Sequence, residues 1–176
     1  MRTRRPNRWA RASSWACRYE RGVTGALPRS ANRQAAPGGA LTLHASCVAV
    51  GPHGLLILGR TGSGKSSLAL SLMAHGAILV ADDRTEVWEQ GGTIRARAPA
   101  AIRGVIEARG IGILAADTVD EVALRAVIDL DETETERLPP HRTRRLFQHD
   151  LPLLHGPLTP TLPAALLQYL KGGRSA

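Results

Sequence analysis

The sequence predicts an α/β domain over residues 41–176. Three observations favour this fold class: short apolar runs of strand length, one amphipathic helical segment, and a glycine-rich loop that joins a strand to that helix. Hydrophobic residues make up 43% of the chain, which is ordinary for a protein with a packed core. No apolar run approaches the roughly 18 to 20 residues that span a bilayer, so we expect no membrane segment.

Residues 1–40 have a different composition from the rest of the chain. They contain nine arginines and a single acid, Glu20, so they hold the whole formal net charge of +8. They are rich in Arg, Ser, Pro and Gly without a helical or strand period, which predicts a basic, disordered extension. A transit peptide and an upstream start site are the alternatives. Because the remaining residues are neutral overall, we do not expect the domain to bind nucleic acid.

The predicted elements follow one another along the domain. The first half has a strand over 41–50, a Gly- and Pro-containing turn at 51–54, an apolar strand over 55–58, a helix over 66–75 and a strand over 77–81. The helix carries leucines on its apolar faces and stops at Gly76. The second half has a hairpin over 85–98 around Gly91 and Gly92, a glycine-containing segment over 100–114, a strand over 124–130, an acidic loop to 136 and an apolar stretch over 158–170.

The loop GRTGSGKS at 59–66 fits the pattern G-x-x-x-x-G-K-[ST] of a phosphate-binding loop. Glycines let the backbone take positive φ and turn successive N–H groups toward phosphate oxygens, and the following helix adds its N-terminal dipole. A glycine-rich turn that matches by chance is the alternative, but the loop follows an apolar strand and opens a helix, as the motif requires. The residues expected to bind the nucleotide are Gly59, Arg60, Thr61, Gly62, Ser63, Gly64, Lys65, Ser66 and Ser67.

A pair of carboxylates follows the strand ILVA at 78–81. Adjacent side chains on an extended backbone point to opposite sides, so one of Asp82 and Asp83 can face the phosphates while the other binds or orients Mg²⁺. A solvated turn into the next hairpin is the alternative. With the phosphate loop present, we favour the functional interpretation and expect ATP and Mg²⁺ as cofactors.

Four blocks make the sequence resemble the catalytic domain of the HPr kinase/phosphorylase family, whose members modify a serine of the phosphocarrier HPr. The blocks are LHASCVAV at 43–50, GRTGSGKSSLALSLMAHGAILVADDR at 59–84, IEARGIGI at 106–113 and ERL at 136–138. They cover about residues 41–140, and E-x-R-G-[IL]-G-I is close to a signature of the family. The resemblance implies a P-loop kinase fold related to the nucleotide-binding core of phosphoenolpyruvate carboxykinase.

The resemblance also implies catalytic roles for single residues. His44 matches the family's active-site histidine, Lys65 its phosphate-loop lysine, and Asp83 the carboxylate that accepts the serine proton. Arg137 matches the late catalytic arginine, in the short block ERL. Taken singly, His44 reads as a half-buried histidine and Arg137 as part of a solvated basic face.

Metal binding is implied for three further positions. Glu107 matches the second magnesium ligand, which joins Ser66, and Asp82 belongs to the metal environment. Taken alone, Glu107 and Arg109 read as a surface ion pair. The joint occurrence of all these residues favours the functional interpretation.

The implied function is an ATP-dependent protein-serine kinase of carbon or nitrogen regulation, of the short, catalytic-domain-only proteobacterial type. Its partner is HPr or a nitrogen-type HPr, and a homo-oligomer is one assembly that the resemblance allows. Because the C-terminal region differs from the family's dephosphorylation region, the sequence does not predict the reverse phosphorylase activity. Two cysteines without a secretory signal indicate a reducing, cytoplasmic setting. An ATP-binding sensor module and a small-molecule kinase are the competing hypotheses.

Overall fold

A computed structural model describes residues 39–156 and 159–175, and the prediction for residues 1–40 lies outside them apart from its last two residues. The main sheet has nine strands, with β1-β5-β6-β9-β3-β2-β4 in order and β11 and β10 added beside β9. Its strands are β1 (Leu41–Leu43), β2 (Ser46–Val50), β3 (His53–Leu58), β4 (Ile78–Ala81), β5 (Thr85–Gln90), β6 (Thr93–Arg97), β9 (Val122–Asp129), β10 (Arg142–Leu146) and β11 (His149–His155). The α/β class is confirmed, and the sheet dominates it.

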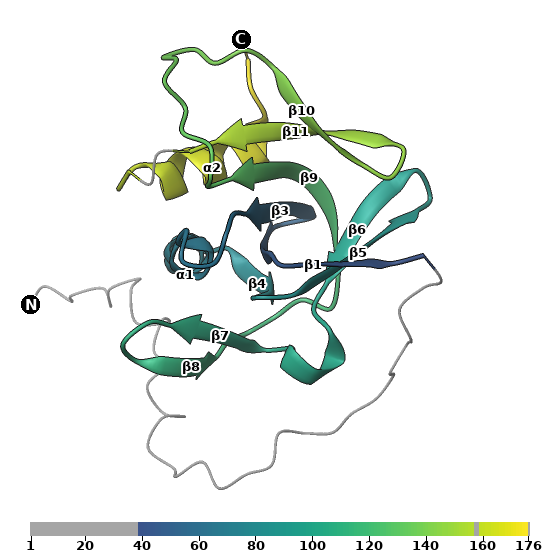
Figure 1. Cartoon of the computed structure of the whole chain (residues 1–176), viewed down its shortest axis with the longest axis vertical. Coiled ribbons are helices and arrows are strands. Elements are labelled where there is room, and N and C mark those ends of the chain that lie inside the picture. Colours follow the sequence, from purple (N-terminus) through teal and green to yellow (C-terminus); the bar gives the residue numbers. More distant parts are fainter. Residues whose placement is uncertain (1–38, 157–158, 176) are drawn as a thin grey trace, which may run out of the picture. The chain divides into compact units, whose positions relative to one another are not determined.

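The remaining elements lie beside this sheet. They are the helices α1 (Lys65–Ala74) and α2 (Leu162–Gly172), a 3₁₀ turn (Ala100–Ile102), and a separate two-stranded sheet of β7 (Val105–Ala108) and β8 (Gly112–Ala115). Both helices pack on the same face of the main sheet (Figure 1). In the part of the chain that the structure describes, neither helix has the length and apolar character needed to cross a bilayer.

Strand β3 lies at the centre of the core. Leu55 and Ile57 pack into the cluster that contains α1 and α2, whereas Leu56 packs into the cluster on the opposite face. All three are fully buried. A strand covered on both faces reads as a continuous apolar run, and β3 also pairs in parallel with β9. The phosphate loop therefore begins at the end of a buried, rigid strand.

The prediction of a single strand over 41–50 is wrong, because this segment forms two strands, β1 and β2. The chain leaves the sheet at His44, so that β1 pairs with β5 while β2 pairs with β3 and β4. The Thr85 hydroxyl donates to the carbonyl oxygen of Ala45 at 2.8 Å and holds this break. An apolar sequence cannot reveal that two halves of one run choose different partners.

The helix over 66–75 is confirmed within one residue at each end. Its C-terminus is a Schellman motif, in which Ala77 N–H donates to Leu72 O and Gly76 N–H donates to Met73 O. Gly76 has φ +98°, as the left-handed position of that motif requires.

The hairpin β10–β11 was not predicted. Strand β10 has the sequence RTRRL and lies at an edge of the sheet, so that it shows no apolar alternation. Strand β11 contains Pro152 and adds to the sheet by pairing in parallel with β9 at Leu153 to His155. The apolar stretch over 158–170 forms α2, which begins at Leu162.

Candidate active site

The glycine-rich loop has the backbone that its sequence predicts. Gly59, Gly62 and Gly64 have φ of +144°, +84° and +95°. A Cβ added at Gly59 would lie 2.4 Å from the Ser63 hydroxyl oxygen, so the close packing of the loop on itself also requires glycine there. Gly64 is the N-cap of α1, and the unpaired amides of this helix open toward the loop. The local geometry suits an anionic group.

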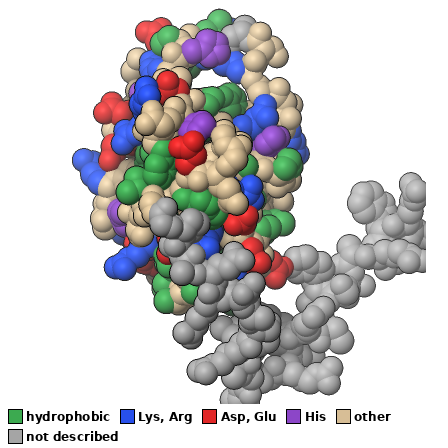
Figure 2. Space-filling model, turned by 90° about the vertical axis from the view of Figure 1, so that its right-hand side faces the viewer, with side chains coloured by type: hydrophobic (Ala, Val, Ile, Leu, Met, Phe, Trp, Pro, Cys, Tyr) green, Lys and Arg blue, Asp and Glu red, His purple; other side chains and the backbone are tan. Residues whose placement is uncertain are grey.

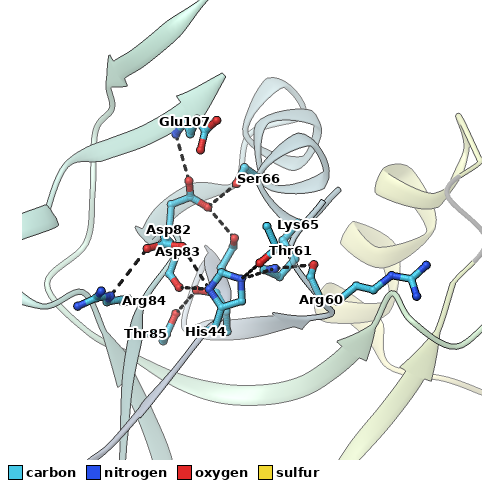
Figure 3. A network of polar contacts seen from close by, with 12 residues as sticks. His44, Arg60, Thr61, Lys65, Ser66, Asp82, Asp83, Arg84, Thr85 and Glu107 are labelled. Atoms are coloured by element: carbon cyan, nitrogen blue, oxygen red, sulfur yellow. Dashed lines mark hydrogen bonds and ion pairs between the residues drawn. The ribbon is translucent and has the colours of Figure 1, made fainter. Parts of the chain in front are cut away.

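Lys65 lies at the base of the loop and is buried. Its ammonium nitrogen lies 2.8 Å from Gly59 O, 3.0 Å from Arg60 O and 3.1 Å from His44 Nε2 (Figure 3). A protonated lysine has three donors and no acceptor, so His44 Nε2 must accept and the imidazole hydrogen lies on Nδ1. In this arrangement the Nδ1–H of His44 points away from the lysine.

Asp83 receives that hydrogen. His44 Nδ1 lies 3.0 Å from the carbonyl oxygen of Asp83 and 3.2 Å from its carboxylate. Arg84 N–H donates to Asp82 O at 2.8 Å across Asp83, which has φ +66°. This is a γ-turn with a non-glycine residue at positive φ, a rare and strained conformation that persists only where its surroundings enforce it. The turn leaves the side chain of Asp83 66% exposed, beside His44.

Asp82 points the other way, into the protein. Its Oδ1 accepts hydrogen bonds from the hydroxyls of Ser46 at 2.6 Å and Ser66 at 2.9 Å, and its Oδ2 accepts from Glu107 N–H at 3.1 Å. Asp82 is only 5% exposed, and three donors offset the cost of burying its charge. One of the two carboxylates is thus buried and the other exposed, and the predicted division of roles between them stays a prediction.

The β7–β8 hairpin forms another wall of the site. Its Glu107 amide is the group bonded to Asp82, while the Glu107 side chain is exposed toward the loop (Figure 3). Glu107 and Arg109 do not pair with each other in the described part of the chain. Both line a pocket of about 190 Å³. Its other lining residues are His44, Thr61, Gly62, Gly64, Lys65, Ser66, Ser67, Asp82 and Asp83.

The donor set of this pocket fits Mg²⁺. Hard oxygen ligands are present in the Ser66 hydroxyl and the carboxylates of Asp82 and Glu107, and Mg²⁺ usually takes one or two carboxylates together with waters and substrate phosphates. The Glu107 carboxylate makes no hydrogen bond to the described residues, so it can act as a ligand. Asp82 already accepts three hydrogen bonds, so it suits an orienting role.

Two residues of the site were not predicted from sequence. Ser46 is fully buried and holds Asp82. Asp131 follows β9, and its two carboxylate oxygens accept from Arg60 N–H at 3.0 and 2.8 Å, which fixes the start of the phosphate loop. Ser46 is the polar residue of the otherwise apolar run at 46–50, and this could have indicated a buried hydrogen-bonding role. Asp131 is one of several acids in a loop and gave no signal.

Arg137 lies apart from the other predicted catalytic residues. It is exposed and does not line the pocket. In the segment that contains it, Glu134 accepts from the guanidinium of Arg142 and from the N–H groups of Thr135 and Glu136. The catalytic role of Arg137 therefore stays a prediction.

The surface outside the pocket carries mixed charge. On the face shown in Figure 2, acidic and basic side chains are interspersed and do not gather by sign. The ion pairs Arg95–Glu121 at 2.7 Å and Arg103–Asp120 at 2.9 Å are examples of this neutralisation. This matches the neutral balance of the sequence after residue 40.

Comparisons with known proteins agree with this geometry. The HPr Serine kinase C-terminal domain family matches residues 38–137. An HPr kinase/phosphorylase of Caldanaerobacter subterraneus is 38% identical over 105 residues, 55% of this chain and 34% of the relative. That of Aromatoleum aromaticum is 37% identical over 115 residues, 58% of this chain and 37% of the relative. The chain thus matches about a third of the length of these curated relatives.

The fold has a solved counterpart in the Hpr(Ser) kinase/phosphatase from Coxiella burnetii. The TM-score is 0.64 at 24% sequence identity, and the match covers 74% of this chain and 88% of that one. At this identity the likeness shows the fold. The family match spans more than half of the chain and includes the phosphate loop, both aspartates and the β7–β8 hairpin. The chain belongs to the HPr Serine kinase C-terminal domain family.

Proposed function

We propose that this protein is an ATP-dependent serine kinase whose acceptor is HPr or a nitrogen-type HPr carrier. The contacts that run from Asp83 through His44 to Lys65 carry the proposal. They join an exposed carboxylate to the phosphate-loop lysine within one pocket. A sensor of ATP has no need of an exposed carboxylate that is held in a strained turn beside the phosphates.

Each residue then has a defined task in phosphoryl transfer. The acceptor serine hydroxyl attacks the γ-phosphorus, its proton passes to the Asp83 carboxylate, and the bond between the γ-phosphorus and the bridging oxygen breaks to release ADP. Lys65 would exchange one of its present acceptors for a phosphate oxygen and offset the charge that develops there. His44 orients Asp83 through Nδ1–H.

Mg²⁺ supplies charge neutralisation for the phosphates when it is bound with ATP. Ser66 and Glu107 would hold it, and Asp82 would orient Ser66 through their hydrogen bond. Arg137 lies outside the pocket, so its proposed contribution requires movement of the segment after β9. The protein is proposed to act in the cytoplasm, and a homo-oligomer stays a proposal.

Intact-mass measurement of carrier phosphorylation tests the function. Purified protein, Mg-ATP and HPr or nitrogen-type HPr are incubated, and a gain of one phosphate on a serine is expected. Asp83→Asn should lower kcat by about 10²- to 10⁴-fold without weakening ATP binding, because the isosteric amide cannot take the proton. Lys65→Ala should weaken both phosphoryl transfer and ATP binding. Tight ATP binding without transfer to either carrier would contradict the kinase and favour the sensor module.

A further inference from the structure

Two of the most exposed large apolar side chains of the described residues lie on one hairpin beside the site. Ile111 is 79% exposed and Ile113 is 67% exposed, and both belong to the β7–β8 hairpin. Leu138, at 76%, lies elsewhere. Two neighbouring isoleucines in water next to a reaction pocket mark a surface that a partner covers.

The hairpin that carries these side chains is anchored to the rest of the domain. Its inner residues, Ile106 and Ala108, are buried, and Ile106 belongs to the core cluster that contains α1 and α2. Glu107 is directly opposite Ile113 in the register, so the two share the outer face. Ile111 N–H donates to Ala108 O at 2.9 Å and closes the turn. The hairpin is therefore anchored on α1 and through Glu107 to Asp82, and Figure 1 shows it as a sheet of its own beside the helix.

The outer face continues directly from the pocket. Glu107 and Arg109 line the pocket, and Ile113 is the cross-strand neighbour of Glu107. Cross-strand neighbours lie about 5 Å apart, and successive residues of an extended chain advance by about 3.3 Å. A protein whose serine reaches Asp83 can therefore place residues near that serine against Ile111 and Ile113, which adjoin the pocket but do not line it.

Charge restricts the occupant further. Arg109 is exposed and makes no ion pair with any described residue. A basic residue in the docked segment would be repelled there, whereas an acidic one would be attracted. The face thus suits a segment with an apolar side chain near its serine and an acidic or neutral residue toward Arg109.

We propose that the outer face of the β7–β8 hairpin, formed by Arg109, Ile111 and Ile113, is the docking surface for the acceptor protein. This inference rests on the proposed kinase function and names the surface that selects its protein substrate. The recognised segment carries an apolar side chain near the acceptor serine. Because Ile111 and Ile113 do not line the pocket, their contacts separate acceptor affinity from ATP affinity.

Steady-state kinetics of the variant Ile111→Ser/Ile113→Ser test the docking surface. The KM for the carrier should rise at least about tenfold, because two isoleucines lose their buried apolar area in the complex. The kcat at saturating carrier and the KM for ATP should stay unchanged. Leu41→Ser is the control, since Leu41 is also an exposed large apolar residue outside the pocket, and it should leave all three constants unchanged.

The possible outcomes are distinct. Wild-type transfer with an unchanged carrier KM in the double variant, or an equal rise in Leu41→Ser, would overturn the docking surface and leave the kinase proposal standing. Failure of the wild type to phosphorylate any carrier would overturn both. A change of sedimentation coefficient in the double variant without a change in carrier KM would assign the face to self-association and would also overturn the inference. Thermal unfolding of each variant verifies that it is folded.

Discussion

Replacing Ser46 by alanine removes one hydroxyl from the buried support of Asp82. Ser46 is fully buried in β2, and its Oγ donates to Asp82 Oδ1 at 2.6 Å. A hydrogen bond to an ionised group contributes about 1.5–3 kcal/mol to stability, and one between neutral groups about 0.5–1.5 kcal/mol. Asp82 keeps its two other donors in the variant, so we expect the fold to persist. We expect Ser46→Ala to lower the free energy of unfolding by about 1.5–3 kcal/mol.

Thr85→Val is the matched comparison. Thr85 is also fully buried, and its hydroxyl donates to a neutral acceptor, Ala45 O, at 2.8 Å. Both variants therefore delete one buried hydroxyl next to the break between β1 and β2, but only Ser46 serves a carboxylate. We expect the smaller loss, about 0.5–1.5 kcal/mol, for Thr85→Val.

Urea denaturation of the two variants and the wild type provides the assay, with the midpoint and slope fitted separately. Ser46→Ala should also weaken Mg-ATP binding in a calorimetric titration, because Asp82 is then held less firmly against Ser66. Thr85→Val should bind Mg-ATP as the wild type does. Equal losses of stability in the two variants, or undiminished Mg-ATP affinity in Ser46→Ala, would refute the argument that the charge of Asp82 makes this hydroxyl special.

Substitutions at two further positions and one labelling experiment test other parts of the structure. Gly59→Ala should fold but lose Mg-ATP binding at least about tenfold in a calorimetric titration, because its Cβ would meet the Ser63 hydroxyl at 2.4 Å and shift the loop; unchanged affinity would show that the loop yields freely. Asp131→Ala should raise the KM for ATP more than it lowers kcat. Asp131→Asn should keep the KM for ATP close to that of the wild type, because its amide oxygen still accepts from Arg60 N–H. Equal defects in the two variants would exclude the positioning role. Burial raises the pKa of the Cys47 thiol, so it should resist a thiol reagent at pH 8 in the native state and react after unfolding, and labelling of Cys47 in the native protein would contradict this.

The phosphate loop was predictable because its determinants are local. Glycines at 59, 62 and 64 with positive φ and the start of a helix at Lys65 are encoded within a few neighbouring residues, and the structure has them where the sequence places them. The strand over 41–50 was wrong because the pairing partner of a strand is not a local property. The hairpin β10–β11 was missed for the same reason, since an edge strand needs no apolar pattern.

The two aspartates show how far sequence reasoning reaches into the site. Alternation along a strand predicts that Asp82 and Asp83 point to different sides, and they do, but the cause is the γ-turn at Asp83, because β4 ends at Ala81. The alternation gives no means to know which of them is buried. Three donors decide this for Asp82, and they come from β2, α1 and β7. The positive φ of Asp83 lies outside any pattern in its sequence, because it follows from the γ-turn between two packed strands.

By itself, the sequence determined the α/β class, the phosphate-binding loop, the carboxylate pair and the family resemblance. Only the tertiary structure decided which distant groups support them: Ser46 to Asp82 across 36 positions, and Asp131 to Arg60 across 71. It also decided that the hairpin carrying Glu107 turns two isoleucines outward beside the pocket. The physical reason is that backbone conformation follows from neighbouring residues, whereas the pairing of buried polar groups follows from how separate strands pack.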